Sequence, residues 1–334
     1  MPPAMVMGIE FFWSEETGLL RPELPKPRLG GSAFPDGFND RGEIVGVRDR
    51  TKICIWSPSD GVTDLADLSQ DATALENVKV EAINNRRQVV GVMDLHQSAS
   101  HVFLWDATEG LTDFGPVANL TMSALAGSSM DLNDRGELVG VTSERMGGAV
   151  GCRVLTGSRD RGLKTVFSAE RLTERSMINN RGQIIVAMGG YPDRCLLWDP
   201  SGVLSELQPP SQTIGIDPMG FSDRGQVVGM ALRHSRAIGS RLSRFWRYWE
   251  KALDYLHFVD RRPFAFLHED GVFHNLNDLI PRNSGWYLRQ ANDINDRGQI
   301  VGVGILDGET RAFLLTPTEL SAPGGGGAGF GLTH

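Results

Sequence analysis

His257 and Asp260 lie close enough in the sequence for a carboxylate to orient an imidazole, which is the arrangement of a general base and its orienter. His234 precedes them in the same segment, residues 233–262, and is a further catalytic candidate. None of these residues has the spacing of a known acid/base or metal-ligand motif. HExxH, GxSxG and P-loop patterns are also absent from the sequence. We therefore expect no metal and no cofactor, and any catalytic role needs a pocket that the fold must build.

Segment 233–262 has the pattern of an amphipathic helix. Its apolar stripe spans about 100° of a helical wheel and consists of Leu242, Phe245, Trp246, Trp249, Leu253 and Leu256. Three interpretations are open: a helix packed on the rest of the fold, a lid over a ligand pocket, or a helix that binds a membrane surface or a partner. If the segment closes a pocket, the binding candidates in it are Arg233, Trp246, Tyr248, Trp249 and Tyr255.

A sequence motif that recurs six times must build the fold that positions these residues. It reads FNDRGEIVGV from Phe38, INNRRQVVGV from Ile83, LNDRGELVGV from Leu132, INNRGQIIVA from Ile178, FSDRGQVVGM from Phe221 and INDRGQIVGVG from Ile294. A period of about 45 residues indicates an array of supersecondary units. The last interval is longer because it contains the 233–262 insertion.

The sequence of each repeat unit predicts four short strands. Strand A ends at the asparagine, strand B follows the glycine, strand C resembles KICIW or HVFLW, and strand D resembles VTDLADL. The D–A connection is the longest, as in a propeller blade whose strand A is innermost. We predict an all-β, six-bladed β-propeller of four-stranded blades. It forms one domain over residues 1–318, with a helical insertion in blade five and a flexible glycine-rich tail at 319–334.

The sixth unit lacks a strand D in this count. The N-terminal LLRPEL could supply it and close the ring with strands from both ends of the chain. Phe11–Trp13 is then a surplus strand, so a seven-bladed propeller with one partial blade is the alternative.

The recurring Asn-Asp-Arg-Gly fits a tight hairpin turn between strands A and B. Asparagine can accept backbone N–H groups two residues on, and glycine takes positive φ without a steric clash. Arg87 replaces the glycine in the second unit. The repeated arginine is not explained by turn chemistry. We expect it to pair with a neighbouring acid or to cap carbonyls, and a ring of arginines that binds an anion is the alternative.

The B–C and D–A loops, including the insertion, lie on one face in this topology. This variable face also contains His96 and His101. Glu81, Asp131 and Asp293 are on predicted inner strands and are binding candidates if they face a central channel. Polar groups at such positions are more often structural, because buried polar atoms need hydrogen-bond partners.

The composition is that of an ordinary globular protein and excludes some partners. The formal net charge of −8 argues against nucleic acid, and no apolar run approaches the roughly 20 residues of a membrane-spanning helix. The N-terminal sequence has no signal-peptide pattern, which favours the cytoplasm. Cys54, Cys152 and Cys195 are expected to be buried thiols. We expect a monomer.

The order NDRGQIVGV, then HVFLW or RAFLL, then a TDL strand resembles the HAF-type bacterial extracellular repeat over about residues 30–317. The resemblance implies a repeated β-fold of propeller type, an extracellular location and no particular reaction. The chain departs from the family in showing no export signal and in carrying the insertion.

Two functions are compatible with these features. The first is a binding module that recognises a small molecule or protein on the variable face near the 233–262 helix. The second is an enzyme of the lyase, hydrolase or cyclase type, with a pocket at the propeller axis under that helix. Propeller folds host both classes, so the fold alone does not choose between them.

Overall fold

The computed structural model describes residues 4–5, 12–14, 18–20, 37–70, 75–96, 100–117, 130–146, 149–169, 173–188, 194–211, 213–233, 263–318 and 329–333. Within these ranges the structure is all-β, with short 3-10 turns at η1 (Leu68–Gln70) and η4 (Leu276–Asp278). No helix in these ranges has the length and apolar character to cross a membrane. The predicted helical insertion lies outside the described residues, except for Arg233.

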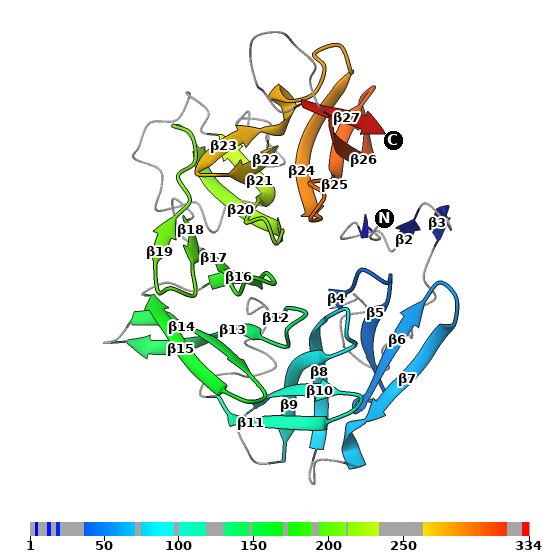
Figure 1. Ribbon diagram of the computed structural model, residues 1–334, viewed down its shortest axis with the longest axis vertical. Helices are drawn as coiled ribbons and strands as arrows, with labels where there is room; N and C mark the ends of the chain where they lie inside the picture. Colours follow the sequence, from blue (N-terminus) through cyan, green and yellow to red (C-terminus); the bar gives the residue numbers. More distant parts are fainter. Residues whose placement is uncertain are drawn as a thin grey trace, which may run out of the picture. The chain divides into compact units, whose positions relative to one another are not determined.

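Six four-stranded antiparallel sheets follow one another along the chain, each with its strands in sequence order (Figure 1). The first three contain β4 (Gly37–Phe38), β5 (Ile44–Arg48), β6 (Lys52–Ser57), β7 (Gly61–Asp67), β8 (Leu75–Ile83), β9 (Val89–Leu95), β10 (His101–Asp106), β11 (Gly110–Pro116), β12 (Asp131–Leu132), β13 (Leu138–Met146), β14 (Ala149–Ser158) and β15 (Gly162–Ala169). The last three contain β16 (Thr173–Ile178), β17 (Ile184–Met188), β18 (Arg194–Trp198), β19 (Leu204–Glu206), β20 (Thr213–Phe221), β21 (Val227–Arg233), β22 (Pro263–Glu269), β23 (Val272–Asn275), β24 (Trp286–Ile294), β25 (Ile300–Leu306), β26 (Glu309–Thr318) and β27 (Gly329–Thr333). The predicted fold class, all-β with six four-stranded propeller blades, is confirmed.

The chain forms two compact units. The first comprises Met1–Met188 and Leu197–Ser205, and the second comprises Gly189–Leu196 and Glu206–His334. In the first unit the A strands β4, β8, β12 and β16 are neighbours, blade after blade. In the second unit β20 and β24 are neighbours in the same way. Strand A is therefore the strand through which successive blades of a unit meet.

Apolar side chains fill the space between adjacent blades. In the first unit, Val45 and Ile53 of blade one form a single buried cluster with Val80 and Phe103 of blade two. Burying surface of this kind stabilises a fold by about 25 cal/mol per Å² of apolar area. The blades are thus held together by strands that are buried along most of their length, such as β10 and β17.

Two close approaches require glycine at Gly91, within strand B of blade two. A Cβ on Gly91 would lie 2.2 Å from the backbone oxygen of Lys79 and 2.9 Å from the ring of Phe103. The backbone of Lys79 is close because β8 contains a β-bulge between Val80 and Ala82. Phe103 is the direct cross-strand partner of Gly91, so its ring covers the space that the glycine leaves open. The same pairing joins Gly229 to Phe266 and Gly302 to Phe313.

The outer strand of the sixth sheet comes from the C-terminal tail. β27 pairs antiparallel with β26, with Thr318 opposite Gly329 and Leu314 opposite Thr333. The prediction that N-terminal strands supply this strand is therefore wrong, and residues 329–333 of the predicted flexible tail form a strand. The N-terminal strands β1 (Ala4–Met5), β2 (Phe12–Ser14) and β3 (Gly18–Leu20) form a separate three-stranded sheet. Phe330 explains the preference for the tail, because it buries its ring in the core of the second unit.

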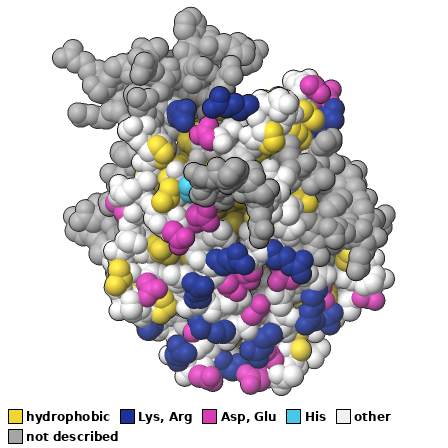
Figure 2. Space-filling view, turned by 45° about the horizontal axis from the view of Figure 1, so that its top comes forward, with side chains coloured by type: hydrophobic (Ala, Val, Ile, Leu, Met, Phe, Trp, Pro, Cys, Tyr) yellow, Lys and Arg dark blue, Asp and Glu magenta, His cyan; other side chains and the backbone are white. Residues whose placement is uncertain are grey.

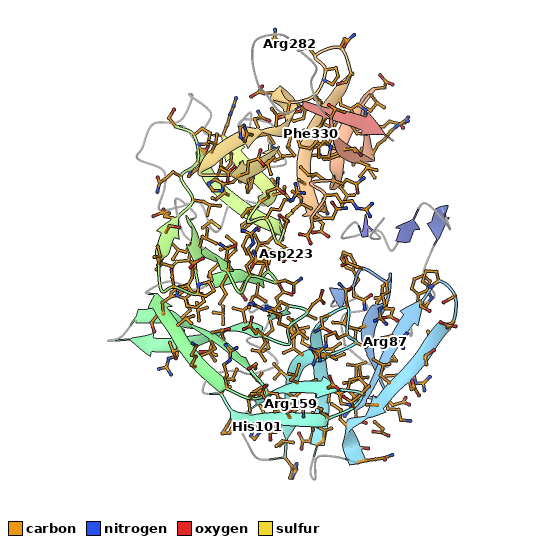
Figure 3. The ribbon with its side chains drawn as sticks, viewed as in Figure 1. Arg87, His101, Arg159, Asp223, Arg282 and Phe330 are labelled. Atoms are coloured by element: carbon orange, nitrogen blue, oxygen red, sulfur yellow. The ribbon has the colours of Figure 1, made fainter. Side chains whose placement is uncertain are left out.

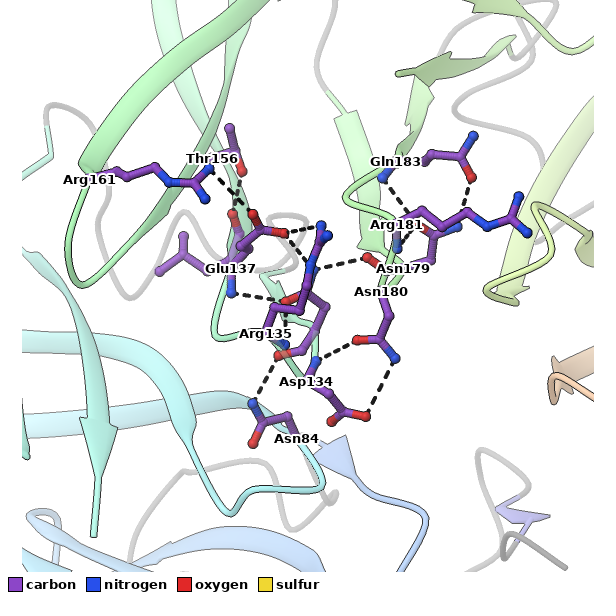
Figure 4. Close-up of polar contacts among 12 residues, drawn as sticks. Asn84, Asp134, Arg135, Glu137, Thr156, Arg161, Asn179, Asn180, Arg181 and Gln183 are labelled. Atoms are coloured by element: carbon purple, nitrogen blue, oxygen red, sulfur yellow. Dashed lines mark hydrogen bonds and ion pairs between the residues drawn. The ribbon is translucent and has the colours of Figure 1, made fainter. Parts of the chain in front are cut away.

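The turn asparagines connect each blade of the first unit to the next (Figure 4). Asn84 accepts the backbone N–H groups of Arg86 and Gln88 through its Oδ1 at 3.0 and 2.9 Å. Its Nδ2 donates to the backbone oxygen of Asn133 in the following blade at 2.9 Å. Equivalent donations run from Asn39 to the backbone oxygen of Asn84 at 3.1 Å and from Asn133 to that of Asn179 at 3.0 Å. We call this series the asparagine ladder.

The next residue of each turn forms a second, parallel series. The backbone N–H of Asp40 donates to Asn85 Oδ1, and that of Asn85 donates to Asp134 Oδ1, both at 2.8 Å. The N–H of Asp134 donates to Asn180 Oδ1 at 2.7 Å. In the second unit, Asp223 donates to Asp296 in the same way at 2.7 Å. A short polar side chain at this position is therefore needed to bind the neighbouring turn.

We expect Gly91→Ala to destabilise the protein and Gly46→Ala to be tolerated. Gly46 is the matched control, because it has the same place in strand B of blade one and its added Cβ would meet only the Cys54 Sγ at 3.9 Å. Overpacking at Gly91 should cost about 2 kcal/mol. Chemical denaturation of the two variants measures the difference, and equal stabilities would contradict this account of the strand-B glycine.

We expect Asn84→Ala to be clearly more destabilising than Asn84→Ser. Alanine leaves the Asn133 carbonyl and two turn N–H groups without partners, at a cost of about 1–3 kcal/mol for a buried group. Serine occupies the equivalent position in blade five, where Ser222 Oγ accepts the N–H of Gln226 at 3.3 Å. Thermal unfolding of both variants tests the ladder. If the alanine variant melted at the temperature of the serine variant, acceptance of the turn N–H groups would add no stability, and if both variants melted with the unmodified chain, the side-chain amide would not be holding the blades together.

Candidate functional site

Most of the sequence-predicted site lies outside the described residues. This applies to the catalytic candidates His234, His257 and Asp260 and to the binding candidates Trp246, Tyr248, Trp249 and Tyr255. Their roles stay predictions. Arg233 is described at the end of β21, where its guanidinium carbon lies 4.9 Å from the centroid of the Phe264 ring. Such a cation–π contact is worth about 0.5–1 kcal/mol at an exposed site and holds the Arg233 side chain against β22.

Two of the acidic residues on inner strands accept hydrogen bonds from backbone N–H groups. Asp131 accepts the N–H of Ile178 in the next blade at 2.9 Å and that of Leu132 at 2.8 Å. Burial raises the pKa of Asp131, although these hydrogen bonds oppose the rise. In the second unit Asp293 accepts the N–H of Ile294 at 2.8 Å, and a Cβ on Gly220 would lie only 2.9 Å from its carboxylate. Both carboxylates therefore contribute to blade contacts.

Glu81 occupies a different local environment. It is the residue left unpaired by the β-bulge in β8, and its carboxylate lies 2.7 Å from Lys79 Nζ. Burial raises the pKa of Glu81, and the ammonium of Lys79 offsets part of that rise. Among the described residues no hydrogen bond joins Glu81 to Asp131, so the structure does not bring these candidates into one constellation.

The histidine that is best placed for acid–base chemistry in the described ranges is His101. Its Nδ1 lies 2.9 Å from both carboxylate oxygens of Asp113, and its side chain is only 11% exposed (Figure 3). The neighbouring Ser100 donates to Asp94 at 2.5 Å. His101 was predicted on the variable face, and its pairing with Asp113 was not predicted from the sequence. A cross-strand reading of HVFLW against LTDF would have found it, because a bulge brings both side chains to one side of the sheet.

The repeated arginine is exposed in all six turns, at Arg41, Arg86, Arg135, Arg181, Arg224 and Arg297. Among the repeated arginines in the described part of the first unit, Arg135 forms an ion pair, with Glu137 of its own turn at 2.5 Å. In the part of the chain that the structure describes, the guanidinium groups of Arg41, Arg86 and Arg181 have no such partner. Figure 4 accordingly draws no contact from the guanidinium of Arg181. No ion pair is therefore found at these three positions, although the charge of Arg41 helps to lower the pKa of Glu43.

Arg87, at the glycine position of the second turn, behaves differently. It has a φ of 60°, which costs a non-glycine residue roughly 1 kcal/mol. Its Nε donates to Glu43 of the preceding blade at 2.7 Å, and Glu43 is almost completely buried. Burial opposes ionisation of Glu43, but hydrogen bonds from Arg87 and Asn39 lower its pKa below the usual value. The ion pair gives a reason for an arginine in a strained position.

In three blades, the glutamine that follows the turn glycine position donates a hydrogen bond to an acidic residue at the end of strand C. Gln88 donates to Asp106, the last residue of strand C, at 2.9 Å. A hydrogen bond from Thr108, helped by Gln88, lowers the pKa of Asp106 well below its usual range. Equivalent bonds join Gln183 to Asp199 at 3.4 Å and Gln226 to Glu269 at 2.8 Å. Where the turn residue is Glu43, strand C ends at Ser57, so two carboxylates never face each other.

These observations define one candidate binding surface, the inner-turn rim. It consists of the turns at residues 39–43, 84–88, 133–137 and 179–183 of the first unit. The asparagine ladder fixes its backbone, and three unpaired arginines project from equivalent positions in it. In the described ranges, no cluster of three or more His, Cys, Asp or Glu side chains could hold a metal ion. The rim can therefore offer guanidinium groups to carboxylates or other anions.

Comparisons with known proteins give structural likenesses only. No protein-family model and no curated protein matches the chain, so the resemblance to the HAF repeat stays a prediction. The β-propeller domain of the Trilobed protease from Pyrococcus furiosus is similar with 9% identity, over 81% of this chain and 77% of that one, at a TM-score of 0.47.

Longer proteins are similar over part of their length. A prolyl endopeptidase has 11% identity, over 83% of this chain and 40% of its own, at a TM-score of 0.47. TolB from Acinetobacter baumannii has 15% identity, over 71% of this chain and 52% of its own, at a TM-score of 0.41. The chain thus spans about half or less of the length of these two proteins.

Proposed function

We propose that the chain is a β-propeller binding module whose inner-turn rim binds the acidic side chains of a protein partner. The observation that supports this is the set of three exposed arginines, Arg41, Arg86 and Arg181, without an ion pair in the described residues. Turn chemistry does not require arginine there, because asparagine and glycine already satisfy the turn. Six repeats of one unexplained, exposed cation suit a surface that meets another charged molecule.

The rim is prepared for binding by its rigidity. The backbone of each turn is held by two bonds to the Asn Oδ1, and the ladder joins the turns of Asn39, Asn84 and Asn133 to the next blade, so little order is lost there on association. Guanidinium groups form bidentate hydrogen bonds with carboxylates and stay charged at any physiological pH. Arginines on successive turns can engage one partner together, and the affinities of linked contacts then multiply.

The distribution of charge favours a protein over a dense polyanion. Asp40 and Asp134 lie next to the arginines in the same turns, with Asn85 donating to both carboxylates at 2.7 and 2.9 Å. Figure 2 shows the same mixture elsewhere, with basic and acidic side chains interspersed on the visible face. A nucleic acid or a sulfated glycan would meet these acids and a formal net charge of −8. A protein surface can place its own carboxylates opposite the arginines alone.

The variable face remains the sequence-based location for binding, near segment 233–262, of which only Arg233 lies within the described residues. An enzyme is the second candidate function, and the His101–Asp113 pair is the observation that favours it. A carboxylate that bonds Nδ1 orients an imidazole for proton transfer at its other nitrogen. Mutating His101 to Gln would separate the two functions, because binding at the inner-turn rim does not use this residue.

The test is a triple variant, Arg41→Ser, Arg86→Ser and Arg181→Ser, with a fluorescein-labelled oligo-glutamate peptide, in which neutral residues separate the glutamates, as the probe. Each exposed charge pair is worth about 0.2–1 kcal/mol, so the triple variant should bind the peptide about tenfold more weakly. Binding by the unmodified chain should fall as salt is raised. Fluorescence anisotropy measures both effects.

The matched control replaces three exposed cations away from the rim: Lys164→Ser, Arg282→Ser and Arg311→Ser. It changes the net charge by the same amount and should keep the affinity of the unmodified chain. An equal loss in both triple variants would show attraction to net charge only and would contradict a site at the rim. Tighter binding of a heparin fragment than of oligo-glutamate would contradict a protein partner.

A further inference from the structure

The guanidinium of Arg135, in the turn of blade three, already holds a carboxylate of its own chain. Its Nη2 lies 2.5 Å from Glu137 Oε2, two residues further along the same turn. The other oxygen of that carboxylate, Oε1, lies 3.5 Å from Nη1 of Arg161, in the turn between β14 and β15. Two arginines from separate turns therefore converge on one carboxylate (Figure 4).

Glu43 occupies the same position in the turn of blade one, but a different arginine holds it. Arg87 of blade two donates to Glu43, and among the described residues Arg41 forms no ion pair. In blade four the position that corresponds to Arg87 is Gly182. A Cβ on Gly182 would lie only 2.8 Å from Arg135 Nη2, so the glycine leaves the room that Arg135 fills. The carboxylate of blade three is therefore bound by the arginine of its own turn.

The turn that contains Arg161 is held in place by blade two. Arg159, two residues earlier, donates to the backbone oxygens of Glu109 and the following glycine at 3.0 and 2.8 Å (Figure 3). The N–H of Arg161 closes the turn by donating to the Ser158 oxygen at 3.2 Å. The backbone at Arg161 is thus fixed, while its side chain is 71% exposed and that of Arg135 is 50% exposed. Both guanidinium groups are accessible to a partner from solvent.

The turn of blade three does not require a carboxylate at Glu137. Burial opposes ionisation of Glu137, but hydrogen bonds from Asn133 and Arg135 lower its pKa below the usual value, so it is charged at neutral pH. Asn133 Nδ2 donates to Glu137 Oε2 at 3.0 Å, and in blade two a glutamine accepts the equivalent bond at 2.7 Å. Glutamine occupies this position in four other turns, as Gln88, Gln183, Gln226 and Gln299.

We propose that Arg135 and Arg161 form a carboxylate-binding clasp, which Glu137 occupies in cis and which an acidic side chain of the partner occupies in its place. This proposal rests on the proposed function of the inner-turn rim and adds Arg161 to that surface. Guanidinium groups on both oxygens of a carboxylate give the strong, charge-assisted contact that a partner's aspartate or glutamate needs. Glu137 is an internal competitor, because a partner's carboxylate has to displace it or bind beside its charge.

The test compares Glu137→Gln with Glu309→Gln, and the probe is the same oligo-glutamate peptide. Glutamine keeps the bond from Asn133 and removes the competing charge. An exposed ion pair contributes little, so Glu137→Gln should bind the peptide about threefold more tightly than the unmodified chain does. Glu309→Gln is the matched control, because Glu309 pairs with Arg311 two residues away at 3.4 Å and its loss changes the net charge equally. This control should keep the affinity of the unmodified chain.

Arg161→Ser separates the clasp from a general gain in positive charge. In the unmodified chain Arg161 is engaged with Glu137, so its loss should leave the peptide affinity unchanged. In the Glu137→Gln chain the same substitution should remove most of the gain, a non-additive result that a merely electrostatic effect of net charge does not give. Fluorescence anisotropy measures the affinities, and circular dichroism checks folding.

The outcomes distinguish the clasp from the rim. Equal affinities of the Glu137→Gln and unmodified chains, with the peptide still bound through Arg41, Arg86 and Arg181, would overturn the clasp and leave the rim intact. An equal gain in Glu137→Gln and Glu309→Gln would also overturn it. A peptide that binds none of these folded chains would contradict the rim and the clasp together.

Discussion

The structure depends on one side chain used repeatedly, the turn asparagine. Asn84 satisfies two N–H groups of its own turn and donates to the carbonyl of the next turn, so one carboxamide both shapes a hairpin and joins two blades. The groups it pairs are buried, and leaving one of them without a partner costs about 1–3 kcal/mol. Local turn chemistry and the contact between blades are therefore the same interaction. This explains why the turn sequence recurs while the D–A loops vary.

The strand pattern was predictable because it is local. Alternating apolar runs, short turn sequences and a constant period led to six four-stranded blades, and the connection lengths led to strand order. The long-range choices were not predictable. The outer strand of blade six is β27 because Phe330 packs in the same buried cluster as Leu276 and Ile280, and no local pattern in the tail predicts that contact. The strand-B glycine was visible in the sequence, but its cause, the bulged backbone of the neighbouring strand with a cross-strand phenylalanine, needs three strands to be in place.

The candidate sites show the same division. Asp131 and Asp293 were chosen for their place on inner strands, and both carboxylates accept backbone N–H groups that sequence alone does not locate. The His101–Asp113 pair was missed because its spacing is set by a bulge between β10 and β11. Turn chemistry did not explain the repeated arginines, and the structure separates those that form ion pairs from those that do not. Arg87 and Arg135 bind glutamates of the rim itself, whereas Arg41, Arg86 and Arg181 keep their charge available to a partner.

The most direct measurement of this account is nuclear magnetic resonance of the arginine Nε–H groups during titration with the oligo-glutamate peptide. The account predicts that the signals of Arg41, Arg86 and Arg181 shift together with a single affinity, while those of Arg282 and of Arg87, which is already paired with Glu43, stay in place. Shifts spread evenly over exposed arginines, or confined to Arg282 and other positions away from the rim, would contradict the assignment of the inner-turn rim as a binding surface.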